Sequence, residues 1–256
     1  MSPQLNRKVA IITGAGRGIG KAFAFRFAEE GARLLLPDIS LERAEKVARE
    51  IRLKGGEAVA IETDISSETA TRAMAEKLMQ LYGRIDILLN NAALFSGFAY
   101  RPWDGWSVAD WQDLYKVNVI GTWLCCKAVA PLMQNQKKGK IINIASDIIK
   151  NPGGQRLLPY ACSKGAVKTL TEMLARALGS YNINVNAIAP GLTNTEAASS
   201  LGDNPEESFK IVVSAQAIHR REEPIDLVGT AVFLASPDSD FITGQLIPVN
   251  GGIWMV

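Results

Sequence analysis

The strongest constraint on the fold is a regular alternation of short apolar runs with longer segments of helical periodicity. Most runs are continuously apolar, which is typical of parallel strands covered on both faces. We expect strands at Lys8–Thr13, Arg33–Asp38, Glu57–Glu62, Ile85–Asn90, Lys140–Ala145, Ile183–Ala189 and Gln245–Asn250. Helices are expected between them, for example Leu41–Lys54 after an N-cap at Ser40, and Ser67–Tyr82 before Gly83. The alternation predicts one α/β domain over residues 1–256, a doubly wound parallel sheet of about seven strands with helices on both faces.

Composition excludes several classes of protein. No apolar stretch reaches the roughly 18 residues that a membrane span needs, and the N-terminal sequence has no apolar core of a signal peptide. A net charge of +2 gives no reason to expect nucleic acid or an anionic membrane as a partner. The three cysteines are expected to be reduced, and no metal site is expected from them and the lone His219. A cytoplasmic protein is therefore predicted.

A glycine-rich turn, TGAGRGIG, follows the first predicted strand. A P-loop requires glycine where Ala15 stands and a hydroxyl where Ala22 stands, so an NTPase is not indicated. Gly14, Gly18 and Gly20 also depart from the strict G-x-G-x-x-G spacing, yet they permit close backbone approach at a helix N-terminus, as a pyrophosphate site requires. Turns of this composition also occur for tight packing alone.

The second predicted strand ends at Asp38, about 20 residues after the glycines. A carboxylate at this place can accept both hydroxyls of an adenosine ribose, and it would repel a 2′-phosphate. NAD is therefore favoured over NADP, although Arg17 offers a phosphate partner. The alternative is that Asp38 merely assists the N-terminus of the next helix.

Tyr160 and Lys164 are four residues apart on a predicted helix and so project from one face. An ammonium beside a phenol favours the phenolate, which predicts a lowered tyrosine pKa and proton exchange near neutral pH. Alone, the pair could equally be an exposed feature of an amphipathic helix. Ser146, however, ends the fifth strand at the same edge of the sheet, where its hydroxyl can bind a carbonyl. Asn118 is expected in a helix kink, holding a water.

Together these motifs resemble the short-chain dehydrogenase/reductase superfamily over nearly the whole chain. The matching segments are the glycine turn, TDI at Asp64, NNAA at Asn90–Ala93, Asn118, Ser146, Tyr160 with Lys164, Pro190-Gly191 and TGQLIPVNGG. Ala93 replaces the usual glycine of NNAG, and Asn250 replaces the commoner aspartate of VDGG. The resemblance implies a Rossmann-like fold and hydride transfer to or from a nicotinamide cofactor.

The resemblance also implies a role for each matched residue. Tyr160 would be the general acid/base, Lys164 would lower its pKa and bind the nicotinamide ribose, Ser146 would orient the carbonyl, and Asn118 would anchor a proton relay through water. The residues implied to bind the cofactor are Gly14, Arg17, Gly18, Ile19, Gly20, Asp38, Asp64, Ile65, Asn91, Ala92, Ala93, Tyr160, Lys164, Pro190, Gly191, Thr193 and Thr195.

The substrate and the assembly are less constrained. We expect a small or aromatic secondary alcohol or ketone in a pocket walled by Ile148, Ile149, Leu157 and Leu158, under a variable lid at about residues 192–218. Core or subunit packing is favoured for Trp103, Trp106 and Trp111, and a solvated charge run for His219–Arg221. A homotetramer is implied, with a second buried surface at Ala166, Leu170, Leu174 and Leu178. The alternatives are a 3-oxoacyl-thioester reductase acting on an acyl-carrier or CoA ester, and a non-catalytic dinucleotide-binding protein.

Overall fold

The computed structural model describes residues 3–95, 99–202 and 204–255. They form one seven-stranded sheet in the order β3-β2-β1-β4-β5-β6-β7, with every neighbouring pair parallel. The strands are β1 (Val9–Ile12), β2 (Arg33–Asp38), β3 (Glu57–Glu62), β4 (Ile87–Asn90), β5 (Gly139–Ile144), β6 (Ile183–Pro190) and β7 (Leu246–Val249). All seven lie where the apolar runs predict them, with bounds shifted by two residues at most. The predicted doubly wound parallel sheet is confirmed.

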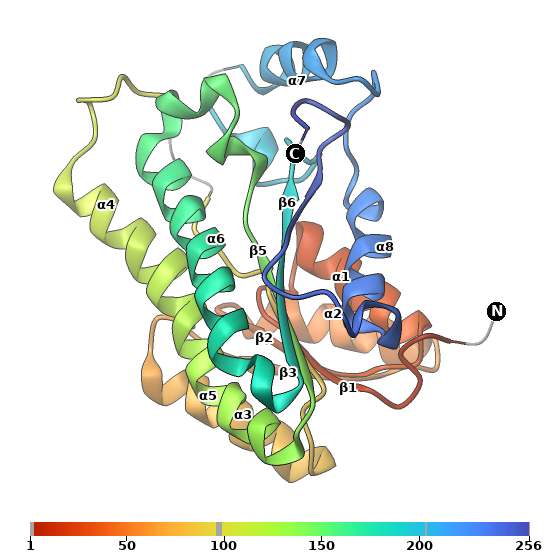
Figure 1. The fold of residues 1–256 in the computed structure, drawn as a ribbon. Coiled ribbons are helices and arrows are strands. Elements are labelled where there is room, and N and C mark those ends of the chain that lie inside the picture. The colour runs from red at the N-terminus through yellow and green to blue at the C-terminus, as the bar shows by residue number, and fades with distance from the viewer. Residues whose placement is uncertain (1–2, 96–98, 203, 256) are drawn as a thin grey trace.

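Helices cover both faces of this sheet (Figure 1). One face carries α1 (Gly18–Glu29), α2 (Leu41–Leu53) and α8 (Pro224–Ala235), and the other carries α3 (Glu68–Tyr82), α5 (Thr122–Gln136) and α6 (Leu158–Leu178). Two further helices, α4 (Val108–Leu114) and α7 (Pro205–Ala215), belong to the long connections near the carboxyl edge of the sheet.

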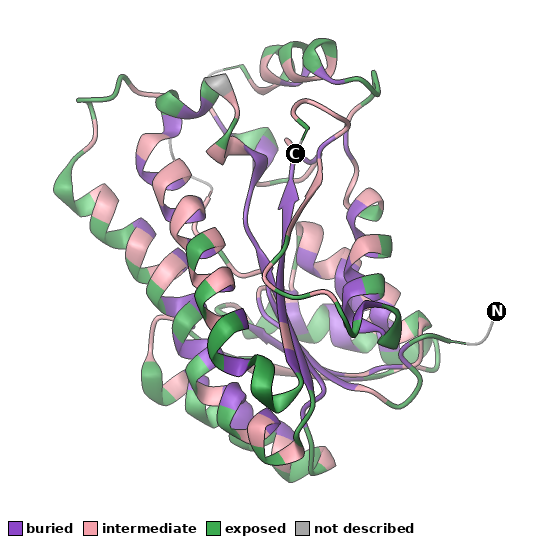
Figure 2. Cartoon of the chain, in the orientation of Figure 1, coloured by how far each residue is buried: buried purple, intermediate pink, exposed green. Residues whose placement is uncertain are grey.

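Each face of the sheet packs on its own hydrophobic core. Phe23 and Phe27 of α1 and Val232 of α8 pack against one face, and Met74 of α3 and Cys125 of α5 pack against the other. The central strands are therefore buried on both sides, as Figure 2 shows by their colour. Burial on both sides is the physical reason that these runs are apolar at consecutive positions.

Local signals in the sequence set the ends of two helices as predicted. The Ser40 hydroxyl accepts a hydrogen bond from the Arg43 amide at the start of α2, and the Ser67 hydroxyl accepts one from Ala70 at the start of α3. Gly83 ends α3 in the left-handed conformation, with φ of 70°. These caps satisfy groups that a helix end leaves without intrahelical partners.

A π-helical segment, Tyr115–Gly121, joins α4 to α5. Such a segment widens the helix locally and interrupts its regular hydrogen bonding. Asn118 lies at its centre and is fully buried, which confirms that this residue occupies an irregular point in a helix.

The strand order reverses between β1 and β4, because the chain builds outward to β3 on one side and to β7 on the other. At such a switch point the connections diverge from the carboxyl ends of the strands and leave a crevice, where ligands bind in open α/β sheets. No helix among the described residues is long and apolar enough to cross a membrane.

Candidate active site

A pocket of about 800 Å³ lies at the carboxyl ends of the strands. It brings together all the residues that the sequence nominated for cofactor binding, and Ser146, Tyr160 and Lys164 as well. Asn118 does not line it, because its side chain is enclosed behind the wall. The structure therefore assembles almost the whole predicted site in one cavity.

The glycine turn between β1 and α1 forms one end of this pocket. Gly14 has φ of 66°, and a Cβ there would lie 2.8 Å from the Cα atom of Ala92. Thr13, which sequence analysis did not single out, fixes the turn to the end of β4: its hydroxyl accepts hydrogen bonds from the amides of Asn91 and Ala92, both at 3.0 Å. The Asn91 side chain in return donates to the carbonyls of Thr13 and Gly14. A side chain at Gly14 would push these two strand ends apart.

Asp38 ends β2 at the far side of the glycine turn and is 6% exposed. Its carboxylate accepts hydrogen bonds from the amides of Gly16 and Ser40, each at 2.9 Å, and pairs with the guanidinium of Arg43 at 3.3 Å. Asp38 thus contacts the start of α2, as the capping alternative expected, while it also lines the pocket. Arg43 was not predicted, because only the fold brings the first turn of α2 beside Asp38 and the pocket.

The end of the pocket that carries Asp38 has features that fit a dinucleotide. Thr63 Oγ1 and Arg43 Nε are buried without a hydrogen-bond partner among the described residues, and both side chains line the cavity. Buried polar groups are normally paired, so unpaired ones in a pocket wall are suited to a polar ligand. Asp64 and Ile65 lie beside them. Glycine backbone, a buried carboxylate and unpaired donors together fit a nicotinamide dinucleotide.

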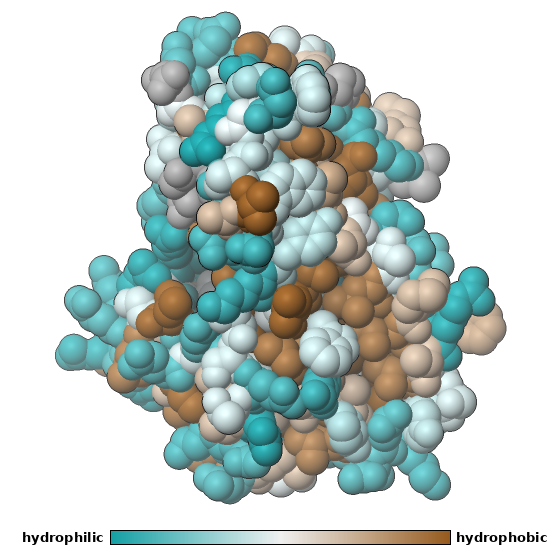
Figure 3. All heavy atoms as spheres, turned by 90° about the vertical axis from the view of Figure 1, so that its left-hand side faces the viewer, coloured by the Kyte–Doolittle hydropathy of each residue, from teal (hydrophilic) through white to brown (hydrophobic). Residues whose placement is uncertain are grey.

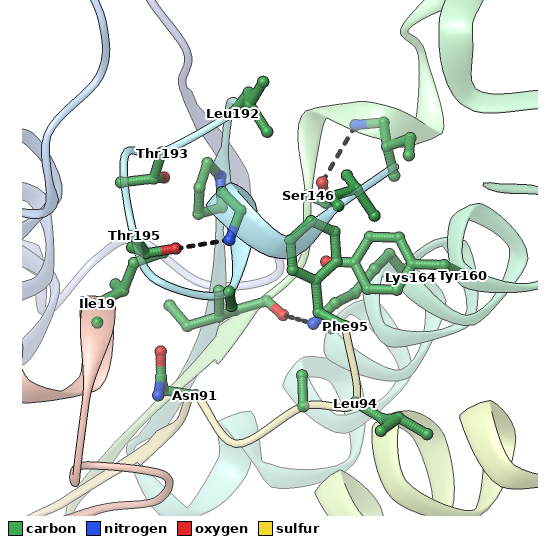
Figure 4. A pocket seen from close by; sticks show the side chains of 18 of the residues that line it. Ile19, Asn91, Leu94, Phe95, Ser146, Tyr160, Lys164, Leu192, Thr193 and Thr195 are labelled. Atoms are coloured by element: carbon green, nitrogen blue, oxygen red, sulfur yellow. Dashed lines mark hydrogen bonds between the residues drawn. The ribbon is translucent and has the colours of Figure 1, made fainter. Parts of the chain in front are cut away.

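Ser146, Tyr160 and Lys164 converge at the opposite end of the pocket, as Figure 4 shows. Ser146 follows β5, and its hydroxyl accepts a hydrogen bond from the Ile148 amide at 3.3 Å. Tyr160 and Lys164 come from the first two turns of α6. The Lys164 ammonium donates to the carbonyl of Ile144 at 2.7 Å and lies 5.7 Å from the centroid of the Tyr160 ring. The ring of Phe95 packs beside that of Tyr160, with centroids 5.0 Å apart.

Burial controls the protonation of this pair. It raises the pKa of Tyr160 above its ordinary value; a hydrogen bond with Ser146 lowers this pKa, and the charge of Asp147 raises it. Burial also lowers the pKa of Lys164 to about 8. The pKa of Tyr160 is thus raised where the sequence predicts it to be lowered, because both groups lose hydration and burial disfavours the ammonium itself. The contribution of Lys164 to this pKa stays a prediction.

The Asn118 side chain forms hydrogen bonds with both the loop after β4 and helix α6. Its Oδ1 accepts a hydrogen bond from the Leu94 amide at 2.7 Å, while its Nδ2 donates to the Leu94 carbonyl and to the Ser163 hydroxyl, each at 3.1 Å. Its backbone carbonyl accepts from the Thr122 hydroxyl at 2.8 Å. Asn118 thus supports the wall that carries Lys164 rather than facing the cavity.

The turn after β6 closes the pocket opposite the glycine turn. Glu222, another residue that sequence analysis missed, is 5% exposed and holds this turn. Its carboxylate accepts hydrogen bonds from the Thr193 hydroxyl at 2.6 Å and the Gly191 amide at 3.0 Å. Burial raises the pKa of Glu222 to about 7. Thr195, at the end of the turn, accepts a hydrogen bond from the Ala198 amide at 3.2 Å.

Comparison with known proteins matches this fold and site to one family. The model described as enoyl-(acyl carrier protein) reductase matches residues 14–254. A (2S)-[(R)-hydroxy(phenyl)methyl]succinyl-CoA dehydrogenase subunit of Thauera aromatica is 38% identical, with 97% of each chain covered. The galactitol 2-dehydrogenase of Agrobacterium fabrum is 39% identical, with 98% of this chain and 99% of that protein covered. This chain is a short-chain dehydrogenase/reductase.

Solved structures agree with this assignment. A 7α-hydroxysteroid dehydrogenase in complex with NADH and 7-oxo glycochenodeoxycholic acid superposes with a TM-score of 0.91, at 37% identity over 98% of this chain and 96% of that one. Structures similar to this dehydrogenase/reductase carry NADH, NAD or NADP. The relatives include enzymes that act on alcohol groups as well as 3-oxoacyl-carrier reductases.

An apolar cluster that includes Tyr160 forms part of the dehydrogenase/reductase pocket wall, and Asn151, Arg156 and Ser208 add polar groups to the lining. Ile148 and Leu157 line the pocket as predicted, whereas Ile149 and Leu158 do not. Residues of the predicted lid also line it, among them Leu192, Leu201 and Ile211. Residues 96–98 of the loop after β4 and residue 203 of the lid lie outside the described residues.

Two predictions about peripheral residues have mixed outcomes. Trp103 is 72% exposed, so it does not pack in the core of this chain. Trp106 packs on the cluster that includes Tyr160, and the centroid of the Trp111 ring lies 6.0 Å from that of the Tyr115 ring.

The interpretation of residues 219–221 as a solvated charge run is confirmed. His219 and Arg220 are exposed, Arg220 pairs with Asp226, and Arg221 pairs with Glu206.

Proposed function

We propose that this protein is an NAD(H)-dependent oxidoreductase that interconverts a secondary alcohol and a ketone. The observation that carries the proposal is that one pocket is lined by two sets of residues. Ser146, Tyr160 and Lys164 lie at one end of it, and the glycine turn and Asp38 lie at the other. Groups suited to a substrate oxygen and groups suited to a dinucleotide thus share one cavity, which hydride transfer between the two molecules requires.

The protein's own groups handle the proton. Tyr160 donates its hydroxyl proton to the substrate oxygen during ketone reduction and takes it back during alcohol oxidation. Ser146 donates a hydrogen bond to the same oxygen and stabilises the charge that develops there. When bound, the nicotinamide ring supplies or accepts the hydride, and its oxidised form carries a positive charge that favours the phenolate.

Lys164 is the next proton carrier. Its pKa of about 8 allows the amine to exchange a proton at neutral to mildly alkaline pH. Asn118, in the π-helical segment, donates a hydrogen bond to Ser163, which precedes Lys164 in α6. We propose that Asn118 anchors a chain of water molecules that carries protons between Lys164 and solvent. A buried ammonium has three donors, and among the described residues that of Lys164 donates to the Ile144 carbonyl. The hydrogen-bonding capacity that is left supports such a relay.

In this proposal, residues at the carboxyl ends of β1 and β4 would hold the cofactor. Gly14, Gly18 and Gly20, with Arg17 and Ile19, surround the pyrophosphate, and Asp64 and Ile65 flank the adenine. Asn91, Ala92 and Ala93 border the ribose, and Pro190, Gly191, Thr193 and Thr195 border the nicotinamide and the phosphates. Asp38 favours NAD, because its buried carboxylate would repel a 2′-phosphate.

We also propose a homotetramer in the cytoplasm. All three cysteines are unpaired, which suits a reducing compartment. Exposed apolar side chains on the α5 and α6 face suit a contact between subunits.

A spectrophotometric screen tests the function. The protein is incubated with NAD or NADP and a panel of aliphatic, aromatic and polyol secondary alcohols, and with NADH or NADPH and the matching ketones. We expect turnover with NAD(H) for at least one pair, with kcat/KM higher than for NADP(H). Binding of NADH without turnover of any alcohol or ketone contradicts the proposal and favours a non-catalytic dinucleotide-binding protein.

A further inference from the structure

The side chain of Asp147 is buried in the pocket wall. Asp147 is 5% exposed and lines the cavity, and its Oδ2 has no partner among the described residues. The other buried carboxylates are paired: Asp38 accepts from three donors, Asp86 from the Val9 amide and Arg84, and Glu222 from two donors. Asp147 is thus the exception among the buried acids of the part of the chain that the structure describes.

The backbone of Asp147 is held firmly, so the carboxylate is presented by a fixed scaffold. Its carbonyl accepts hydrogen bonds from the amides of Lys150 and Asn151 and from the Trp254 indole at 3.0 Å. These three donors come from the turn after β5 and from the C-terminal segment. An unpaired ionised carboxylate in such a place costs several kcal/mol, roughly, and that cost falls when a donor is supplied.

Asp147 is close in sequence to one of the proposed catalytic residues and interacts electrostatically with another. It follows Ser146 directly, and its charge acts on Tyr160 while the charge of Glu222 acts on it. Asp147 also lines the same cavity as Tyr160 and as the Gly191–Thr193 turn that Glu222 holds. Burial raises the pKa of Asp147 to about 7, as expected for a carboxyl that lacks a donor.

The cavity that Asp147 lines has polar side chains, among them Asn151, Arg156 and Ser208, as well as apolar ones. Ile148, Leu157 and Leu201 provide apolar surface there. We expect a ketone whose oxygen is bound by Ser146 and Tyr160 to place the substituent of the carbon next to its carbonyl near Asp147, the residue that follows Ser146. A hydroxyl is the group that satisfies a carboxylate acceptor at that place.

We propose that Asp147 accepts a hydrogen bond from a hydroxyl on the carbon adjacent to the reacting carbon, so that the preferred substrates are vicinal hydroxyketones and diols. The inference rests on the proposed oxidoreductase function and names its substrate class. Asp147 would select these substrates over simple ketones, because a ketone without the hydroxyl leaves the buried carboxylate unpaired in the complex.

Matched substrate pairs test the inference. NADH oxidation is followed with 3-hydroxybutan-2-one against butan-2-one, 2-hydroxycyclohexanone against cyclohexanone, and benzoin against deoxybenzoin. In at least one pair we expect kcat/KM to be higher for the hydroxyketone by about 10- to 100-fold, the value of a hydrogen bond to a charged group. Asp147→Leu should abolish this preference, and Asp147→Asn, which keeps an acceptor oxygen, should retain part of it.

Controls separate the possible failures. Gln155→Ala, an exposed residue of the same connection that does not line the pocket, should leave the preference unchanged. Equal turnover of both members of every pair by the wild type overturns the inference but leaves the proposed function intact. The inference is also overturned if Asp147→Leu lowers kcat/KM equally for the hydroxyketone and the simple ketone of a pair and weakens NADH binding in a fluorescence titration. The carboxylate would then act on cofactor binding and not on the choice of substrate. No NADH oxidation with any ketone overturns the proposed function and this inference with it.

Discussion

At the scale of single residues, the pocket combines polar groups that the protein has fully paired with polar groups that it has buried unpaired. Asn118, Asp38 and Glu222 have several hydrogen bonds each and hold backbone in place. Thr63 Oγ1 and Asp147 Oδ2 have none among the described residues. Paired groups build the cavity walls, and unpaired ones are available to ligands.

Replacing the phenol tests the proposed proton donor. Tyr160→Phe removes only the hydroxyl, so the fold and the cofactor contacts should persist while kcat falls by roughly 10²- to 10⁴-fold. Steady-state NADH production measures the loss, and fluorescence titration should give an NADH affinity within a few-fold of wild type. Cys162→Ser, on the same helix but outside the pocket lining, is the matched control. A near-normal kcat for Tyr160→Phe would assign the proton transfer to another group.

Asp38 and Arg43 together offer a test of cofactor choice. Asp38→Ala removes the carboxylate that repels a 2′-phosphate and releases the guanidinium that pairs with it at 3.3 Å. We expect the ratio of kcat/KM for NADP to that for NAD to rise about tenfold or more, because arginine binds phosphate well. Adding Arg43→Ala should remove most of this gain, and thermal unfolding checks that both variants fold. An unchanged ratio in Asp38→Ala would place the selectivity elsewhere.

At the scale of elements, distant segments are joined by buried side chains at the carboxyl edge of the sheet. Thr13 and Asn91 join the ends of β1 and β4, Asn118 joins the π-helical segment to the loop after β4 and to α6, and Glu222 joins the segment before α8 to the turn after β6. These bonds fix the loops that form much of the pocket wall, since a loop has little core of its own.

The buried Glu222 carboxyl makes part of the stability dependent on pH. Its pKa is raised to about 7 from an ordinary value of 4.5, so the fold favours the protonated form. The stability from this group is complete below pH 4.5 and is lost as the pH rises through about 7. Glu222→Gln should remove that loss, and the Tm of the variant relative to wild type should rise between about pH 5.5 and about pH 8. Asp147, with a pKa also raised to about 7, should leave a residual pH dependence.

Thermal unfolding of both proteins at the two pH values measures this effect. Glu29→Gln, on the exposed side of α1, is the control and should show a Tm difference that does not vary with pH. If the Tm difference for Glu222→Gln were equally independent of pH, the Glu222 carboxyl would not be titrating in the native state over this range.

At the scale of the whole molecule, one side remains apolar. Figure 3 shows hydrophobic side chains gathered on the side that carries α4, α5 and α6. Ile120, Trp123 and Met173 are each more than 40% exposed there. The predicted second surface is only partly present, because Ala166, Leu170 and Leu174 are half-buried whereas Leu178 belongs to the core.

The mass in solution tests the proposed assembly. Light scattering coupled to gel filtration should give about four times the 27.7 kDa of one chain. Trp123→Glu should shift the mass to a smaller species, because a charge in an apolar interface is poorly solvated. Leu53→Glu, at an exposed position of α2 on the other face of the sheet, should leave the mass unchanged. A wild-type monomer would contradict the proposal.

The sequence by itself determined the strands, the helix ends and the pairing of Tyr160 with Lys164. Each depends on residues close together in the chain: consecutive apolar positions, a serine or glycine at a helix end, and a four-residue spacing on one helix face. The carboxyl-edge rule for parallel strands then brought Ser146, Asp38 and the glycine turn to one crevice without any knowledge of side-chain contacts.

Only the tertiary structure decided how these groups are paired and how well they are hydrated. Glu222 reaches Thr193 across 29 positions of sequence, and Arg43 reaches Asp38 only because α2 starts beside the pocket. The pKa of Tyr160 moved opposite to the prediction for the same reason: spacing shows that an amine is near, whereas burial depends on every element packed around it. Asp147 likewise looks ordinary in the sequence, since the lack of a donor for its carboxylate is a property of the whole folded wall.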